Sequence, residues 1–106
     1  MTDRIQTIKK MLAEKGDDSF LIYSLGMELA SAGRFDEAAG QFRRCLELDS
    51  ESLPAYAELG KALRSAGRGD EAREMFAAGM DLAARQGESH MRDYLRQQLD
   101  GLPEGK

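Results

Sequence analysis

Cys45 and His90 are the one cysteine and the one histidine of this chain, and their side chains are the types that most often serve as nucleophile, base or metal ligand. Cys45 lies far from His90 in the sequence. One thiol and one imidazole are too few for a zinc site. We therefore expect Cys45 to be a small core residue and His90 to be solvated. The residues predict no catalytic group and no metal site, so the chain is not expected to be an enzyme.

Two acidic pairs, Asp36-Glu37 and Asp70-Glu71, are the other concentrated chemical groups. Both pairs stand where helices are expected to begin, and carboxylates there complement the partial positive charge of the helix N-terminus. The glycines are isolated and do not form the glycine-rich loop that cradles a phosphate. We interpret the acidic pairs as helix-stabilising and expect no cofactor.

Composition limits the partners that this chain can have. It contains 106 residues, 42% of them hydrophobic, with a formal net charge of −4. This length fits one domain, and the acidic balance argues against a nucleic-acid partner. The N-terminal residues lack the layout of a secretory signal, and no run approaches the roughly 20 apolar residues that cross a bilayer. Together with a single cysteine, these features predict a soluble cytoplasmic protein with no membrane partner.

A block of sequence recurs with a spacing of 34 residues: Ser31-Ala32-Gly33-Arg34 returns as Ser65-Ala66-Gly67-Arg68. The residues around the block recur at the same spacing: Ile22 as Tyr56, Leu25 as Leu59, Gly26 as Gly60, Leu29 as Leu63, Ala38 as Ala72, and Phe42 as Phe76. A fixed period of this size is typical of stacked repeats, in which each unit buries its apolar face against a neighbour.

Apolar residues at helical spacing predict the elements that build these repeats. We expect six helices, at about residues 2–15, 19–32, 35–49, 54–66, 70–85 and 88–102. Thr2 or Asp3 would cap the first helix, and Gly16 would end it. Pro54 suits the first turn of the fourth helix. Residues 103–106 form a polar tail that is expected to fray.

The recurring residues resemble the tetratricopeptide repeat family. That family's pattern has a large residue, two spacers, Leu-Gly, two spacers and another large residue, with a later alanine and an aromatic residue four positions on. The first copy presents this pattern as Ile22, Leu25-Gly26, Leu29, Ala38 and Phe42, and the second copy matches the same slots. The departures are leucine in place of the family's usual tyrosine and other residues in place of its late proline: Leu29, Leu63, Ser50 and Ala84.

The resemblance implies an all-α fold in which antiparallel helix hairpins stack as a short right-handed α-solenoid of about six helices. We expect one domain over residues 1–106, divided into an N-terminal half-repeat helix at 1–16, repeats at 19–52 and 53–86, and a C-terminal capping helix at 88–102. In each repeat, the helical glycine would let the paired helix approach closely, with the alanine at 38 or 72 as its small partner. Phe42 and Phe76 would fill the gap toward the next repeat.

The C-terminal capping helix aligns with the second repeat after one inserted residue, which places Leu95 in the slot of Gly60. A leucine in that slot predicts that no paired helix packs closely there.

The resemblance also implies a binding surface, because the first helix of each repeat in this family lines a concave groove that holds a peptide. The side chains expected to face this groove are apolar toward one end and basic toward the other: Phe20, Tyr23, Met27, Ala57, Lys61, Arg64, Arg92 and Arg96. Some family members hold a peptide's C-terminal carboxylate with Lys, Asn and Arg in these slots, and this chain has no asparagine. We expect a protein–protein interaction module that binds a peptide or partner protein, with an acidic or C-terminal segment as one option.

An alternative is a self-associating scaffold, in which another copy occupies the groove or the ends of the repeat stack. Exposed side chains at Phe20, Tyr23 and Met27 would suit either function. The alternative reading of Arg92 and Arg96 is a solvated face of the capping helix.

Overall fold

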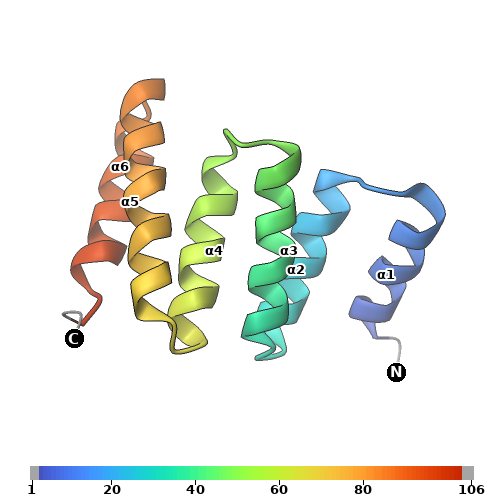
Figure 1. Cartoon of the computed structure of the whole chain (residues 1–106). Coiled ribbons are helices and arrows are strands. Elements are labelled where there is room, and N and C mark those ends of the chain that lie inside the picture. Colours follow the sequence, from blue (N-terminus) through green and yellow to red (C-terminus); the bar gives the residue numbers. More distant parts are fainter. Residues whose placement is uncertain (1–2, 104–106) are drawn as a thin grey trace.

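The computed structural model describes residues 3–103, and these residues fold into six α-helices without a strand (Figure 1). The helices are α1 (Arg4–Lys15), α2 (Ser19–Ser31), α3 (Phe35–Leu48), α4 (Leu53–Ser65), α5 (Gly69–Gln86) and α6 (Ser89–Asp100). The expected all-α repeat solenoid is confirmed. The expected helix start at Thr2 and the tail beyond Pro103 lie outside the described residues. No helix among residues 3–103 is both long and apolar enough to cross a membrane.

Short polar caps begin three of the helices. The Asp3 and Asp18 carboxylates accept hydrogen bonds from the backbone of α1 and α2, and the Ser52 hydroxyl does so for α4. These bonds satisfy backbone donors that have no partner inside the helix. Between the helices of each hairpin, Gly33 and Gly67 adopt φ values of 77° and 80°, which side-chain-bearing residues rarely adopt. The recurring Ala-Gly-Arg segment is therefore a turn that the sequence specifies twice.

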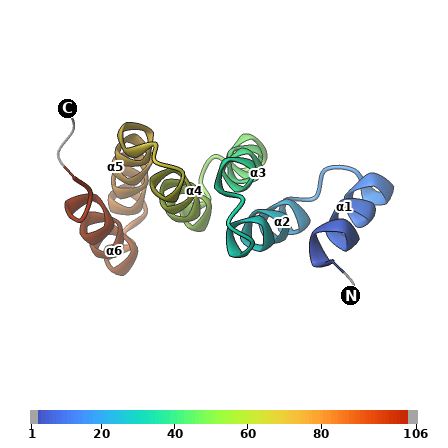
Figure 2. The same ribbon diagram turned by 90° about the horizontal axis from the view of Figure 1, so that it is seen from below.

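Consecutive helices lie side by side and form two layers (Figure 2). Helices α3 and α5 form one layer, and α2, α4 and α6 form the other, with α4 flanked by α2 and α6. We call the surface formed by α2, α4 and α6 the inner face. Helix α1 packs against α2 at the N-terminal end, and α6 packs against α5 at the other end.

The helical glycines of both repeats face a phenylalanine ring of the paired helix. A Cβ atom at Gly26 would lie 2.6 Å from the Phe42 ring, and one at Gly60 would lie 2.4 Å from the Phe76 ring. Both rings are fully buried. The expected close approach is present, but its partner is corrected: the ring of the same repeat, and not the alanine at 38 or 72, lies nearest the glycine. Phe42 and Phe76 follow these alanines by four positions. Each ring therefore lies one helical turn further along the same side of its helix.

Helix α6 is anchored differently from the expectation. Leu95 is fully buried, and a Cβ atom at Gly79 of α5 would lie 2.9 Å from its Cδ1 atom. The expectation concerned a paired helix following α6, and no helix follows α6 within residues 3–103; Leu95 packs instead against the preceding helix, α5. The small residue of this contact lies on the preceding helix, so α6 needs no following helix to bury its leucine. Leu102 joins the same hydrophobic cluster just after α6 ends.

Arginines at the inter-helix turns form surface ion pairs, and Arg68 links the two repeats. Arg68 bonds Glu71 of its own repeat at 2.7 Å and Asp36 of the preceding repeat at 2.9 Å. Its counterpart Arg34 bonds Glu37 at 2.7 Å. The acidic pairs at the starts of α3 and α5 thus also serve as partners of these arginines. All of these pairs are solvent-exposed, so each contributes little alone.

Candidate functional site

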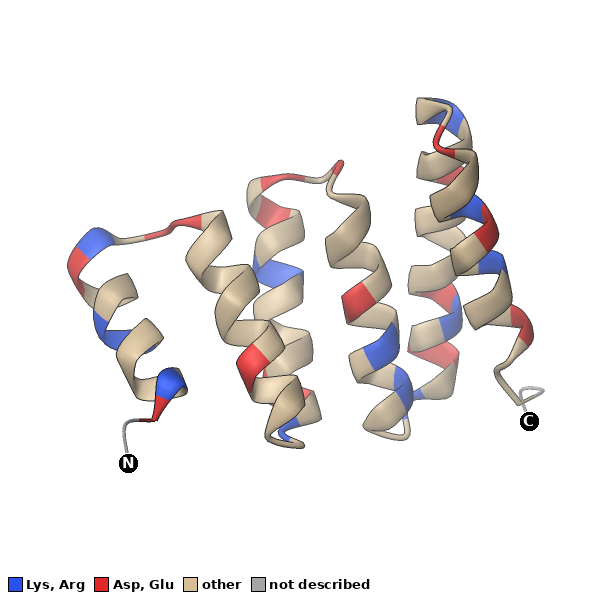
Figure 3. Cartoon of the chain, turned by 180° about the vertical axis from the view of Figure 1, so that it is seen from behind, with Lys and Arg blue, Asp and Glu red and all other residues tan. Residues whose placement is uncertain are grey.

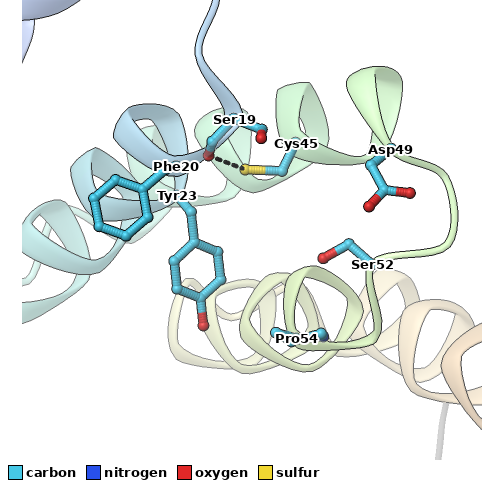
Figure 4. A pocket seen from close by; sticks show the side chains of 7 residues that line it. All are labelled: Ser19, Phe20, Tyr23, Cys45, Asp49, Ser52 and Pro54. Atoms are coloured by element: carbon cyan, nitrogen blue, oxygen red, sulfur yellow. Dashed lines mark hydrogen bonds between the residues drawn. The ribbon is translucent and has the colours of Figure 1, made fainter.

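A first cavity of about 440 Å³ opens on the inner face between α2 and the start of α4 (Figure 4). Its lining combines aromatic, polar and acidic side chains: Ser19, Phe20, Tyr23, Cys45, Asp49, Ser52 and Pro54. Phe20 is 75% exposed, the largest exposure among the exposed large hydrophobic side chains of the described residues. A phenyl ring this exposed gains little from folding, so its presence is not explained by core packing.

Tyr23 forms an anchored wall of the first cavity. Its ring meets Phe42 edge-on, with centroids 5.6 Å apart, so the hydrophobic core holds the ring in place. Figure 4 shows the ring extending toward α4. Burial raises the pKa of the Tyr23 hydroxyl, and the nearby Glu58 carboxylate raises it further. The hydroxyl is therefore a neutral hydrogen-bonding group at neutral pH.

Cys45 lies at the back of the same cavity. Its thiol donates a weak hydrogen bond to the Ser19 carbonyl oxygen at 3.8 Å, and burial raises the thiol pKa. A thiolate is the reactive form of cysteine, so this environment disfavours reactivity. The expectation that Cys45 is a small core residue is confirmed by its burial.

A second cavity of about 520 Å³ lies between the first turns of α4 and α6. Its lining is Pro54, Ala57, Glu58, Glu88, His90, Met91 and Tyr94. Pro54 also lines the first cavity, so the two cavities adjoin across the N-terminal turn of α4. We call these two adjoining cavities, whose walls together include residues of α2, α4 and α6, the upper groove.

A third cavity of about 270 Å³ lies between the C-terminal halves of α2 and α4 and contains Met27, Lys61 and Arg64. Lys61 pairs with Glu58 at 3.4 Å. Burial lowers the pKa of Lys61, but Glu58 and the Tyr94 hydroxyl outweigh burial and raise it. Both cations of this cavity therefore have internal partners, since Arg64 donates to Gln98 at 2.6 Å.

The structure does not gather the eight expected groove residues into one site. Phe20 and Tyr23 line the first cavity and Ala57 lines the second, although Ala57 itself is almost fully buried. Met27, Lys61 and Arg64 share the third cavity.

Arg92 and Arg96 line none of these three cavities. Each stands two residues from Tyr94, about 200° around the helix, so both lie on the side of α6 away from Tyr94. Arg92 pairs with Asp93 at 3.3 Å. The four basic side chains therefore do not form a single cluster, and only Lys61 and Arg64 remain on the expected surface.

Tyr94, His90 and Glu88 belong to the inner face, although repeat alignment did not assign them to it. The reason is the length of α5. Helix α3 ends at Leu48, whose counterpart is Leu82, but α5 continues to Gln86. The added turn of α5 takes up most of the linker, so two residues separate α5 from α6, whereas four separate α3 from α4. Helix α6 therefore turns a different side toward the inner face. The fifth helix was already expected at about residues 70–85, and the effect of this length on the rotation of α6 is the signal that repeat alignment left out.

A model of the tetratricopeptide repeat family matches residues 29–92. The chain belongs to the tetratricopeptide repeat family. Domains of this family are in general non-catalytic modules for protein–protein interaction. The family assignment expected from the recurring residues is thereby confirmed.

Solved structures agree with this assignment. A Bordetella parapertussis protein determined in solution superposes with a TM-score of 0.82 at 28% identity, covering 94% of this chain and 87% of its own. A tetratricopeptide repeat domain protein from Salinibacter ruber gives a TM-score of 0.74 at 25% identity, with coverage of 85% and 94%. A structure of MamA (MSR-1) gives 0.68 at 23% identity, covering 91% of this chain and 56% of its own. No curated protein matches the chain.

Proposed function

We propose that the inner face binds an extended segment of a partner protein, with apolar side chains of that segment seated in the upper groove. The observation that carries this proposal is Phe20, whose 75% exposed ring stands beside a cavity walled by the anchored ring of Tyr23. Concave apolar surfaces with a few placed polar groups are the usual form of a ligand site. Exposed aromatic rings at such a surface are typical anchors for a partner.

An acidic or C-terminal segment was one option for the ligand. In that case Lys61 and Arg64 would receive the carboxylate through charge-assisted hydrogen bonds. Because Glu58 and Gln98 already bond these two side chains, a carboxylate would have to displace internal partners. The proposal therefore rests on the apolar upper groove and does not require an acidic ligand.

Capture of partners from the native lysate tests the proposal when wild type is compared with two matched variants. Phe20→Ala removes the exposed ring from the groove, whereas Leu48→Ala removes an exposed side chain, 48% accessible, from the end of α3. We expect a partner protein that wild type and Leu48→Ala capture and that Phe20→Ala does not. Equal retention of every partner by both variants would contradict it.

Self-association is the competing outcome and needs its own measurement. Light scattering of the wild-type chain at two concentrations separates the two functions. A concentration-independent monomer agrees with capture of a different protein. Concentration-dependent growth that Phe20→Ala abolishes would mean that a second copy supplies the segment.

A further inference from the structure

We propose that the segment bound in the upper groove carries a lysine or arginine next to its apolar anchor residue. This inference rests on the proposed function, because it names the chemistry of the ligand of the same groove. It starts from the charges around the groove and from the way that the chain connects its helices.

The three connections that lead into the inner helices are acidic. Residues 16–18, 49–52 and 87–88 contain no lysine or arginine, and they contain these carboxylates: Asp17, Asp18, Asp49, Glu51 and Glu88. Figure 3 shows the inner face, with the acidic colouring at the edge where α2, α4 and α6 begin. The opposite connections carry Arg34 and Arg68 instead. The three connections beside the upper groove, which we call its rim, therefore carry negative charge without positive charge.

Helix capping accounts for only part of this rim. The Asp18 carboxylate caps α2, and Asp17 pairs with Arg44. In contrast, Glu88 stands at the N-cap of α6 without making a side-chain cap bond. Within residues 3–103, Asp49 and Glu88 form no ion pair. Both carboxylates line the groove, so their charge is available to a ligand.

The lining of the groove suits a cation flanked by apolar groups. The first two cavities contain three carboxylates, those of Asp49, Glu58 and Glu88, and no lysine or arginine. Glu58 pairs with Lys61 at 3.4 Å, so the attraction for a cation comes from Asp49 and Glu88. The rings of Phe20, Tyr23 and Tyr94 contribute to the same walls. Aromatic faces attract ammonium and guanidinium groups, and carboxylates complement them electrostatically. An acidic segment would instead meet like charges.

Selection from a phage-displayed library of random dodecapeptides provides the test. Four forms of the chain serve as bait: wild type, Phe20→Ala, Glu88→Gln, and Glu74→Gln as the matched control. Glu74 is an exposed glutamate of α5, outside the cavities of the inner face. The expected result is that wild type and Glu74→Gln select peptides enriched in Lys or Arg beside a large apolar residue. A selected peptide should bind Glu88→Gln about two- to fivefold more weakly, as for loss of one exposed ion pair.

Different outcomes contradict the proposed function and the proposed charge of the ligand. Peptides recovered equally well by Phe20→Ala and wild type would overturn the proposed function together with this inference. Peptides lost on Phe20→Ala but enriched in Asp or Glu, or showing no charge preference, would overturn the inference alone. Unchanged affinity of a Lys- or Arg-bearing peptide for Glu88→Gln would also overturn it.

Discussion

Gly79 of α5 and Leu95 of α6 interlock, since a Cβ atom at position 79 would lie 2.9 Å from the Leu95 Cδ1 atom. This contact joins α6 to the repeat stack and so holds Tyr94 and Glu88 on the inner face. Leu95→Ala should therefore lower the free energy of unfolding by about 2–5 kcal/mol, the usual range for a buried leucine. Urea unfolding measures this loss. Gln97→Ala, at an exposed position of the same helix, is the control and should change little. A Leu95→Ala variant as stable as wild type would mean that α6 is not part of the cooperative core.

Removal of α6 altogether should have a larger effect. A chain ending at Gly87 loses the leucine that covers Gly79, and it exposes the apolar side of α5. Repeat arrays need a terminal unit with a polar outer face to stay soluble. We expect aggregation or a clearly lower melting temperature, measured by light scattering and circular dichroism. An equally stable monomer would contradict this.

The helical glycines provide a matched pair of substitutions. A Cβ atom at Gly60 would lie 2.4 Å from the Phe76 ring, whereas one at Gly40 would meet nothing within 4 Å. Gly60→Ala should lower the free energy of unfolding by about 1–3 kcal/mol through overpacking. Gly40→Ala should raise it by up to about 1 kcal/mol, because alanine favours the helix. Thermal unfolding of both variants decides the question, and equal effects would refute the proposed glycine–ring packing.

Acidification should weaken the ion pair between Arg68 and Glu71 at the start of α5. Hydrogen bonds from Arg68, and its positive charge, hold the pKa of Glu71 below its ordinary value of 4.5. A carboxyl group with a lowered folded-state pKa stabilises the fold above its unfolded pKa, and this stability is lost as the pH falls. The urea midpoint should therefore decrease below pH 4.5. Glu71→Gln should show a smaller decrease than wild type, and an identical pH profile would remove Glu71 from the explanation.

Alkaline pH should act through Cys45. Burial raises the pKa of its thiol above the ordinary value of 9.0. The folded state then holds this proton more tightly than the unfolded state, so the stability it contributes is present below pH 9.0 and is lost as the pH rises through the folded pKa. Urea unfolding from pH 8 to 11 should show this loss, and Cys45→Ala should reduce it. A profile unchanged by Cys45→Ala would contradict the assigned cause.

Sequence reasoning predicted the parts of this fold that depend on local pattern. The 34-residue period identified the hairpins, and Asp3 and Gly16 marked the two ends of the first helix at their observed positions. It did not predict that Phe42 and Phe76 stand nearest the helical glycines. Spacing within a helix says which residues share a side, but not how deeply a ring reaches into the neighbouring helix.

The candidate site was harder to predict because it depends on α6. Repeat alignment assumed that α6 starts at the same rotation as α4, which placed Arg92 and Arg96 in the groove. The added turn of α5 changes that rotation and brings Tyr94 and Glu88 to the inner face instead. The sequence contains no third full repeat that would have revealed this rotation. The expected basic cluster therefore differs from the structure because the residues of α6 were aligned in the wrong register.

Chemical-shift mapping with a peptide selected on the wild-type chain tests the central claim, that the inner face is the binding surface. Amide signals of ¹⁵N-labelled protein are recorded while the peptide is added. We expect the largest changes at inner-face residues around the upper groove, including Phe20, Tyr23, Ala57 and Tyr94. Changes confined to the outer layer of α3 and α5, with the inner-face signals unmoved, would contradict it.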